Sequence, residues 1–257
     1  MSAETPATVS VEFKVATREG SFTAQVPVPT GQTNLVQLLP VLQALDDGLV
    51  QAATAQRAKE GVHVSCKAGC GACCRQMVPI SIFEAEFLAN WMRTLPEERQ
   101  EQLAERFHRG LQALQAAGIL ERMESAEAFA LDDAGREFAI DYLRQQIPCP
   151  FLEAESCSIH PIRPLVCREY LVSSPPEHCG YPSAHKPEAI NVLLRLARVL
   201  NSTAAELEPG TRGWIPLLFL PVWMEKDEHP GSQIAGSGPD VLGKVFQHIA
   251  VGQNTET

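Results

Sequence analysis

The sequence predicts a mostly α-helical protein with a small N-terminal β-hairpin and a long proline-rich irregular segment organised by a metal. Three observations predict this class. Hydrophobic residues recur every three or four positions over much of the 257-residue chain, which is the period of an amphipathic helix. Strict alternation of apolar and polar residues is confined to residues 8–29. Between residue 147 and Pro187 the chain carries seven prolines, which disfavour long regular elements there.

The alternating segment is the first predicted element. Residues 8–15 place apolar side chains on one face, and residues 22–28 repeat this pattern after a short polar turn. Pro27 cannot donate a ladder hydrogen bond, so its strand is an edge strand. The apolar positions are Val9, Val11, Phe13, Val15, Phe22, Ala24, Val26 and Val28.

Helices are predicted along most of the remaining chain. Residues 33–59 carry leucines at helical spacing, with a bend or restart at Pro40. Ser81 followed by Glu84 is typical of a capping box that begins a second helix. The other predicted helical segments are Pro96 to Gly118, residues 133–146 and Pro187 to Leu200. The tail after Lys226 is rich in Gly and Ser and contains a short apolar piece at 241–249.

Composition and charge exclude some functions. A formal net charge of −10 repels phosphate backbones, so we expect no nucleic-acid partner. The longest apolar run, residues 214–224, is too short to cross a membrane. The N-terminus has neither the basic start nor the apolar core of a signal peptide, so we expect a cytoplasmic protein. A protein partner remains open.

The eight cysteines carry the functional signal. Four lie within nine positions, and four are spread over the proline-rich segment. In a reducing compartment, thiols gathered so closely hold metal more often than they form disulfides. Adjacent cysteines cannot both reach one metal without strain, so Cys73 and Cys74 point to two metals or two sites. The eight predicted metal ligands are Cys66, Cys70, Cys73, Cys74, Cys149, Cys157, Cys167 and Cys179.

The order of these motifs resembles a known family. The block Cys66–Lys–Ala–Gly–Cys70–Gly–Ala–Cys73–Cys74 is followed by Cys–Pro–Phe–Leu at 149–152, Cys–Ser–Ile–His at 157–160 and Arg–Pro–Leu–Val–Cys–Arg–Glu–Tyr at 163–170. This combination is similar to the YkgJ-type cysteine-cluster family, a zinc- or iron-chelating domain with relatives among flagellin lysine N-methylases. The first block is one residue longer than the CxxCxxCC pattern of that family.

The chain then divides into three predicted parts. Residues 1–62 form an N-terminal hairpin and helix, residues 63–226 a cysteine-cluster metal-binding helical domain, and residues 227–257 a C-terminal tail. Four further residues are predicted to support the ligands. His160 is a ligand or a donor to one, Arg163 and Arg168 offset thiolate charge or pair with Glu169 or Glu153, and Tyr170 packs beside them.

The metal is not fixed by ligand type, because zinc and iron–sulfur clusters both take four thiolates. Compact C-x2–4-C pairs are typical of structural zinc, and the later four cysteines contain none, so we prefer iron as an iron–sulfur cluster or another multinuclear centre. The spacing of Cys66, Cys70 and Cys73 also matches the radical S-adenosylmethionine signature. Ala72 stands where that family prefers an aromatic residue, and no alternating strands follow.

The predicted function is therefore a cytosolic metal-binding protein with a cysteine-ligated iron centre, acting in redox chemistry or metal handling. One alternative is a zinc-stapled interaction module. Another, implied only by the family resemblance, is an enzyme similar to protein lysine N-methyltransferases. For that activity a cofactor pocket is needed, and the Gly-Ser-Gly-Pro-Asp run at 236–240 is predicted to be a loop that follows no strand. Whether the protein is an enzyme stays undecided, and no catalytic residue is predicted.

Overall fold

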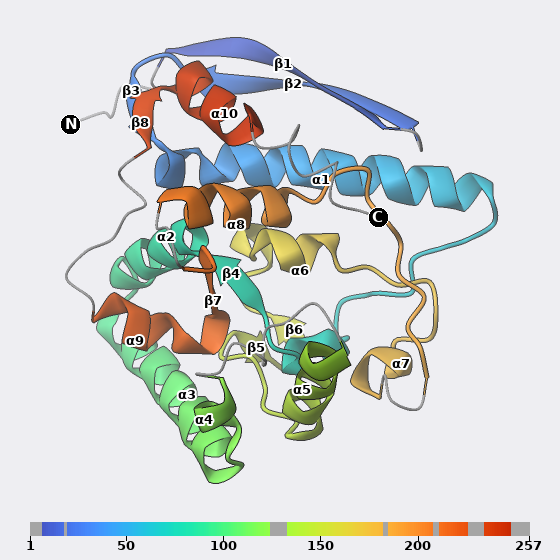
Figure 1. The fold of residues 1–257 in the computed structure, drawn as a ribbon, viewed down its shortest axis with the longest axis vertical. Helices are drawn as coiled ribbons and strands as arrows, with labels where there is room; N and C mark the ends of the chain where they lie inside the picture. The colour runs from blue at the N-terminus through green and yellow to red at the C-terminus, as the bar shows by residue number, and fades with distance from the viewer. Residues whose placement is uncertain are drawn as a thin grey trace.

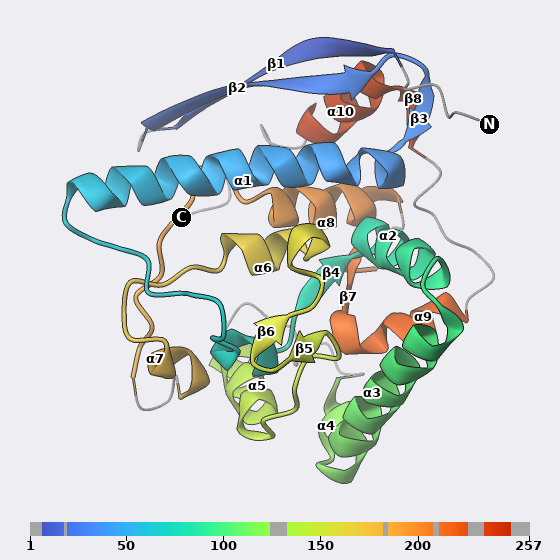
Figure 2. The same ribbon diagram turned by 180° about the vertical axis from the view of Figure 1, so that it is seen from behind.

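The fold is helical with a small antiparallel strand pair at the N-terminus (Figures 1 and 2). The computed structural model describes residues 7–17, 20–123, 133–181, 185–207, 211–225 and 234–247. Within these residues it contains ten α-helices. The described residues include no helix of the length and hydropathy that a membrane crossing requires.

The predicted hairpin is confirmed. Strands β1 (Thr8–Thr17) and β2 (Gly20–Pro29) pair antiparallel, with Val11 opposite Val26 and Phe13 opposite Ala24. Phe13, Val15, Val26 and Val28 are buried. Their face covers α1 (Leu35–Lys59) and α10 (Gly238–Gln247), and the Phe13 and Phe246 ring centroids lie 4.5 Å apart. The hairpin therefore closes one side of the core.

Helix α1 lies across the width of the molecule, between the hairpin and the helices below it (Figure 1). It begins at a capping box in which the Asn34 side chain accepts from the Gln37 amide and Gln37 Oε1 accepts from the Asn34 amide. Pro40 lies inside the helix without interrupting it. The helix therefore does not restart at Pro40.

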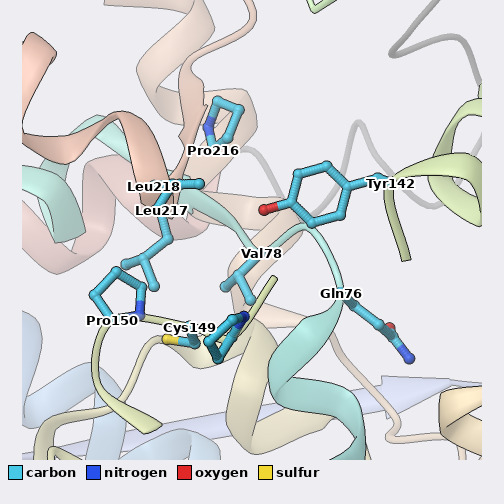
Figure 3. Close-up of a pocket in the computed structure, with 9 residues that line it drawn as sticks. Gln76, Val78, Tyr142, Cys149, Pro150, Pro216, Leu217 and Leu218 are labelled. Carbon is cyan, nitrogen blue, oxygen red and sulfur yellow. The ribbon is translucent and has the colours of Figure 1, made fainter. Parts of the chain in front are cut away.

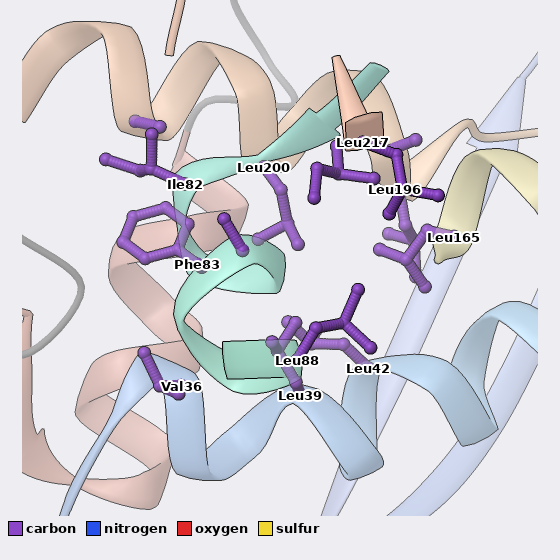
Figure 4. Packing of buried hydrophobic residues seen from close by; sticks show 14 of the residues in the cluster. Val36, Leu39, Leu42, Ile82, Phe83, Leu88, Leu165, Leu196, Leu200 and Leu217 are labelled. Carbon is purple, nitrogen blue, oxygen red and sulfur yellow. The ribbon is translucent and has the colours of Figure 1, made fainter. Parts of the chain in front are cut away.

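Beneath α1 lies the main core, formed with α2 (Ile82–Arg93), α6 (Leu165–Glu169) and α8 (Leu196–Leu207). Figure 4 shows Leu39 and Leu42 of α1 close to Leu88 of α2. The capping box predicted for α2 is present, because Ser81 Oγ accepts from the Glu84 amide and Glu84 Oε2 accepts from the Ser81 amide.

A second helical layer lies below the core. It comprises α3 (Glu97–Ala116), α4 (Ile119–Arg122), α5 (Asp133–Arg144), α9 (Leu220–Met224) and the short 3₁₀ helix η4 (Leu217–Phe219). Leu103, Phe107 and Leu114 are the buried face of α3. Gly110 lets α3 approach η4 closely, since a Cβ there would lie 2.6 Å from Leu218 Cδ1.

Two small sheets pair strands that lie far apart in the chain, and neither was predicted. Strand β3 (Gln32–Asn34) pairs with β8 (Ala235–Ser237), and β4 (Pro79–Ser81) pairs with β7 (Trp214–Pro216). Residues 236–240 are therefore not a loop, because they finish β8 and begin α10. A Cβ on Gly238 would lie 2.3 Å from the Pro29 carbonyl oxygen, so packing against β2 explains this glycine.

The helix predicted from Pro187 to Leu200 is displaced. The structure has α8 at Leu196–Leu207 instead. The Ile190 amide donates to the Leu171 carbonyl at 2.8 Å, and the Ser173 amide donates to the Glu188 carbonyl at 2.9 Å. This extended pairing occupies the backbone groups that a helix would need, so the apolar spacing of residues 190–197 gave a wrong prediction.

The proline-rich segment contains only short elements. These are β5 (Leu152–Glu153), β6 (Ser156–Cys157), η3 (His160–Ile162), α6 and α7 (Glu177–Gly180). Irregular backbone connects them. This segment and the loop after α1 together carry all eight cysteines.

Candidate metal centre

The first cysteine block is a turn followed by one turn of 3₁₀ helix. The Cys70 amide donates to the Lys67 carbonyl at 3.1 Å, and Gly69 adopts the left-handed conformation that this turn requires (φ 82°). Helix η1 (Ala72–Arg75) then presents Cys73 and Cys74. The block is therefore helical only at its end.

Several hydrogen bonds join this block and its flanking residues to the proline-rich segment. The Cys149 amide donates to the Cys74 carbonyl at 2.7 Å, and the Ser65 amide donates to the Val172 carbonyl at 2.9 Å. The Gly69 amide donates to Ser156 Oγ at 3.1 Å, and Gln76 Nε2 donates to the Cys179 carbonyl at 3.2 Å. The two halves of the cysteine set are thus held together by the chain itself.

The turn between β5 and β6 positions Cys157. Leu152 pairs with Cys157 across the turn, whose tip residues Ala154 and Glu155 both have positive φ values (47° and 57°). Such a conformation costs about 1 kcal/mol or more for each non-glycine residue. Arg75 Nη1 and Nη2 donate to the Glu155 carboxylate at 3.0 and 2.7 Å, which holds the turn against η1.

Glu153 fixes the other side of the same turn. Arg99 and Arg106 of α3 both donate to its Oε1, the latter at 2.9 Å. These arginines hold the pKa of the Glu153 carboxyl below its ordinary value. Neither Arg163 nor Arg168 forms the salt bridge with Glu153 that the sequence offered as an alternative.

Helix α6, which carries Cys167, is held by buried charged residues at both ends. Glu84 Oε1 accepts from the Leu165 amide at 2.8 Å, and Glu169 Oε1 accepts from the Ala197 amide at 2.9 Å. Arg168, only 4% exposed, donates from Nη1 to both carboxylate oxygens of Asp47 at 2.7 and 2.8 Å. Its remaining bonds go to the carbonyls of Pro161 and Arg163.

Arg168 therefore secures the loop before Cys167, and its salt bridge is with Asp47 rather than with Glu169. Sequence reasoning missed Asp47, Gln76 and the bond from Leu165 to Glu84. The capping box had identified Glu84, but only its contact with Ser81 could be read from local spacing.

The eight thiols are all unpaired. Burial raises the pKa of Cys149 to about 12 and that of Cys179 to about 11, and it raises the pKa of Cys167 well above its ordinary value. A hydrogen bond with Cys74, followed by burial, raises the pKa of Cys73. Protonated thiols must therefore lose protons when a metal binds.

Arg163 is a cation whose charge acts on several thiols. Burial raises the pKa values of Cys66 and Cys157, and the positive charge of Arg163 opposes both rises. The same charge opposes the rise at Cys73 and lowers the pKa of His160. Arg163 Nε is buried and has no hydrogen-bond partner among the described residues, so it is a donor available to a thiolate.

Tyr170 contacts the centre directly. It is hydrogen-bonded to Cys179 and accepts from Gln76 Nε2 at 3.3 Å, while burial raises the pKa of its hydroxyl to about 12. His160 is exposed, and its ring lies in the field of Arg163. Among the four residues predicted to support the ligands, Arg163 and Tyr170 therefore interact most closely with thiols.

A small apolar crevice adjoins Cys149 (Figure 3). Val78, Pro216, Leu217 and the Tyr142 ring contribute to its lining, and its volume of about 10 Å³ would hold no more than one water molecule. It offers no room for an organic substrate or a methyl donor.

The gathered thiols do not yet form a coordination sphere. Within the described residues, no three histidine, cysteine, aspartate or glutamate side chains are placed to bind one metal ion together. The donor set nevertheless fits zinc or iron, because eight thiols with a buried, unpartnered guanidinium nitrogen suit a thiolate-rich centre.

A helical framework that joins two segments carrying eight free cysteines is typical of a cysteine-rich metal-binding protein. Residues 65–188 match the model of the CxxCxxCC family, described as "Putative zinc- or iron-chelating domain". The match confirms the resemblance predicted from the cysteine motifs. Comparison of the chain with curated proteins and with solved structures found no match.

Proposed function

We propose that the chain is a cytosolic protein that holds a cysteine-ligated iron centre and uses it in redox chemistry or metal handling. The observation that carries the proposal is the gathering of all eight free thiols from segments about a hundred residues apart. The direct bond from the Cys149 amide to the Cys74 carbonyl joins the two halves of this set.

The chain's own residues supply what such a centre needs. The cysteines bind as thiolates and release their protons. Arg163 offsets accumulated negative charge, and Tyr170 donates a hydrogen bond to Cys179, which lowers the basicity of that sulfur. Iron, when bound, would supply a one-electron redox couple or a transferable cation.

The position of the centre favours exchange over a purely structural role. Residues 67–69, which connect Cys66 to Cys70, are exposed, and His160, three positions after Cys157, is exposed as well. A partner or a small redox reagent can therefore approach the thiols without crossing the core.

A zinc staple is the second candidate. It is favoured by the turns and short helices that surround the thiols, because a metal would hold such irregular backbone together. The methyltransferase alternative gains no such support. Packing against Pro29 explains why residue 238 is a glycine, so no role in binding a cofactor is needed for it. The crevice beside Cys149 is too small for a methyl donor.

The proposal is tested on the full chain purified without oxygen. Metals by mass spectrometry, acid-labile sulfide and a visible spectrum are measured on one sample before and after dithionite. Iron in at least stoichiometric amount, with a spectrum that dithionite changes, supports the proposal. Stoichiometric zinc without colour contradicts the proposal and leaves a structural zinc site as the candidate function. A chain that binds neither metal contradicts both.

A further inference from the structure

We propose that the chain forms a dimer through strand β1, which pairs antiparallel with β1 of a second copy about a two-fold axis at Phe13. The two hairpins then make one four-stranded sheet. This interface does not depend on the metal centre, because the two strands of the hairpin contain no cysteine.

Strand β1 has one edge without a partner. Among the described residues it pairs with β2 alone, in a sheet of two strands. Figures 1 and 2 both show β1 at the margin of the molecule, beyond β2 as seen from α1. Backbone amides and carbonyls along such an edge are a template for a further strand.

The alternation of hydrogen bonds shows which backbone groups face this open edge. The Thr30 amide donates to the Ala7 carbonyl at 2.9 Å, one step beyond the pair of Thr8 with Pro29. Hydrogen-bonded and non-hydrogen-bonded pairs alternate along an antiparallel ladder. Odd-numbered residues of β1 therefore bond to β2. The amides and carbonyls that point to the open edge belong to Thr8, Ser10, Glu12, Lys14 and Ala16.

The far edge of β2 is blocked, in contrast. Pro29 lies opposite Thr8 and Pro27 lies opposite Ser10, so both prolines occupy positions of β2 that face away from β1. Proline has no amide hydrogen, and natural sheets use it on edge strands to prevent pairing. Strand β1 contains no proline or glycine, and its register with β2 has no bulge. The hairpin therefore has one protected edge and one open edge.

The charges of β1 fit a second copy of β1. Glu12 and Lys14 flank Phe13 on the exposed face, where their side chains pair at 2.6 Å. When Phe13 lies opposite Phe13 of the second copy, Glu12 of each copy faces Lys14 of the other. Facing opposite charges stabilise an antiparallel pair, and this happens at two symmetry-related places.

Neighbouring registers lack this complementarity. An axis at residue 12 places Glu12 opposite Glu12, and an axis at residue 14 places Lys14 opposite Lys14. Facing like charges destabilise a strand pair. A lysine on an edge strand commonly prevents pairing, but here each lysine meets a carboxylate of the second copy, so the charges select the register centred on Phe13.

Apolar contacts on the inner face support the same register. Val11 of each copy faces Val15 of the other, and the two Phe13 side chains meet at the axis. Val9 is 42% exposed and Val11 is half-buried, so β1 has apolar surface left to bury. A two-stranded ribbon is also marginal in water, whereas a four-stranded sheet with one apolar face is stable.

The test measures the molar mass of the full chain by analytical ultracentrifugation across a concentration series, with a thiol reductant present. The wild type is expected to reach twice the 28.1 kDa of one chain. Glu12→Lys and Lys14→Glu each place like charges opposite one another at two places. Each variant is therefore expected to raise the dissociation constant about 10-fold.

Exchanging the charges tests the register. The double variant Glu12→Lys/Lys14→Glu restores opposite charges and is expected to recover the wild-type dissociation constant. An equimolar mixture of the two single variants is also expected to form a dimer, because two positive charges of one chain then face two negative charges of the other. Failure of both would overturn the register centred on Phe13.

Proline variants test the edge itself. Ser10→Pro removes an amide from the open edge, leaves both charges in place and is expected to abolish the dimer. Gln25→Pro makes the same change on the blocked edge of β2 and is the matched control, which keeps the dimer. Urea unfolding at high dilution, where the chains are separate, shows whether each variant is folded. The charge variants are expected to match the wild type there, because Glu12 and Lys14 are exposed.

Other outcomes overturn the proposal. A wild-type chain that stays monomeric at about 100 μM, where even a weak specific dimer forms, excludes the interface. A dimer that survives Ser10→Pro and both charge variants uses another surface. A dimer seen only without reductant is joined by a disulfide. If the proline variants do not fold, the charge variants decide. Metal content is measured on the same samples, and a chain without metal that still dimerises contradicts the proposed iron centre alone.

Discussion

Glu84 Oε1 accepts a hydrogen bond from the backbone amide of Leu165 at 2.8 Å, across 81 positions of the chain. The same carboxylate closes the capping box of α2 through Ser81. One fully buried side chain therefore fixes the start of α2 and the start of α6 relative to each other, and α6 carries Cys167. Burial raises the pKa of this carboxyl, while the bonds from Leu165 and Ser81 oppose that rise.

Replacing Glu84 is therefore expected to destabilise the fold. Glu84→Ala leaves the Leu165 and Ser81 amides without an acceptor in the core, which costs about 3 kcal/mol of unfolding free energy. Urea unfolding of the metal-free protein measures this loss. Glu105→Ala removes an exposed carboxylate that pairs with Arg109, and is expected to change stability by less than about 0.5 kcal/mol. Similar effects of the two variants would contradict the bridging role.

Asp46 predicts a dependence of stability on pH. Its side chain is fully buried on α1, and neither carboxyl oxygen has a hydrogen-bond donor among the described residues. Burial, followed by the charge of Glu169, raises its pKa to about 8, whereas Arg168 opposes the rise and Asp47 and Glu84 add to it.

Because the folded-state pKa exceeds the ordinary value of 3.8, the stabilising contribution of Asp46 is complete below pH 3.8 and is lost as pH rises toward 8. Asp46→Asn cannot ionise, so its unfolding free energy is expected to fall less between pH 4 and pH 8 than that of the wild type. Urea titrations across this range measure the difference. Glu12→Gln, on the exposed hairpin, should follow the wild-type curve, and a parallel curve for Asp46→Asn would refute the prediction.

Arg163 is expected to strengthen metal binding without being a ligand. Removing its charge leaves the thiolate cluster uncompensated, so Arg163→Gln should weaken metal affinity about 10- to 100-fold. Arg163→Lys retains the charge and should recover part of the loss. Competition with a chelator measures each affinity. Arg109→Gln removes an arginine that is exposed on α3 and serves as the control; unchanged affinity in Arg163→Gln would count against the assignment.

Two glycines of α10 are expected to respond in opposite directions to the same substitution. A Cβ at Gly238 would lie 2.3 Å from the Pro29 carbonyl oxygen and 2.4 Å from Val28 Cγ1, so Gly238→Ala forces the hairpin away and should cost about 1–3 kcal/mol. Nothing lies within 4 Å of a Cβ at Gly243, so Gly243→Ala should stabilise the helix by up to about 1 kcal/mol. Thermal unfolding measures the stability of both variants. If Gly238→Ala stabilises the protein, α10 does not pack against Pro29 and Val28 as the structure shows.

Local patterns predicted the elements that local physics determines. The alternation of Val11 and Phe13 with polar residues and the spacing of Ser81 and Glu84 gave the hairpin and the start of α2, because each signal lies within a few residues. Pairings such as β4 with β7 depend on segments more than a hundred residues apart, which no local pattern encodes. The same limit explains the error at residues 187–195, where long-range pairing overrides helical spacing.

The residues of the candidate site also fall into two groups, those that the sequence reveals and those that only the folded structure reveals. The cysteines and Arg163 could be named from residue type and motif order. Asp47, Gln76 and Glu153 are ordinary polar residues in the sequence, and their contacts with Arg168, Cys179 and α3 follow only from the folded arrangement. Their partners lie between about 50 and 120 positions away, so nothing near them in the sequence marks them as supports of the thiols.

The bond between Cys149 and Cys74 has a consequence for biosynthesis. A chain made from its N-terminus presents Cys66 to Cys74 about a hundred residues before Cys179, which at typical synthesis rates is a delay of roughly 5–20 seconds. For most of that interval, until Cys149 is made, the four early thiols have none of their later partners. The cysteines of the nascent chain must therefore stay reduced and free of other metals until its second half has emerged. The redox potential of the cellular thiol pool and the metal supply near the ribosome then help to decide which ion the finished protein carries.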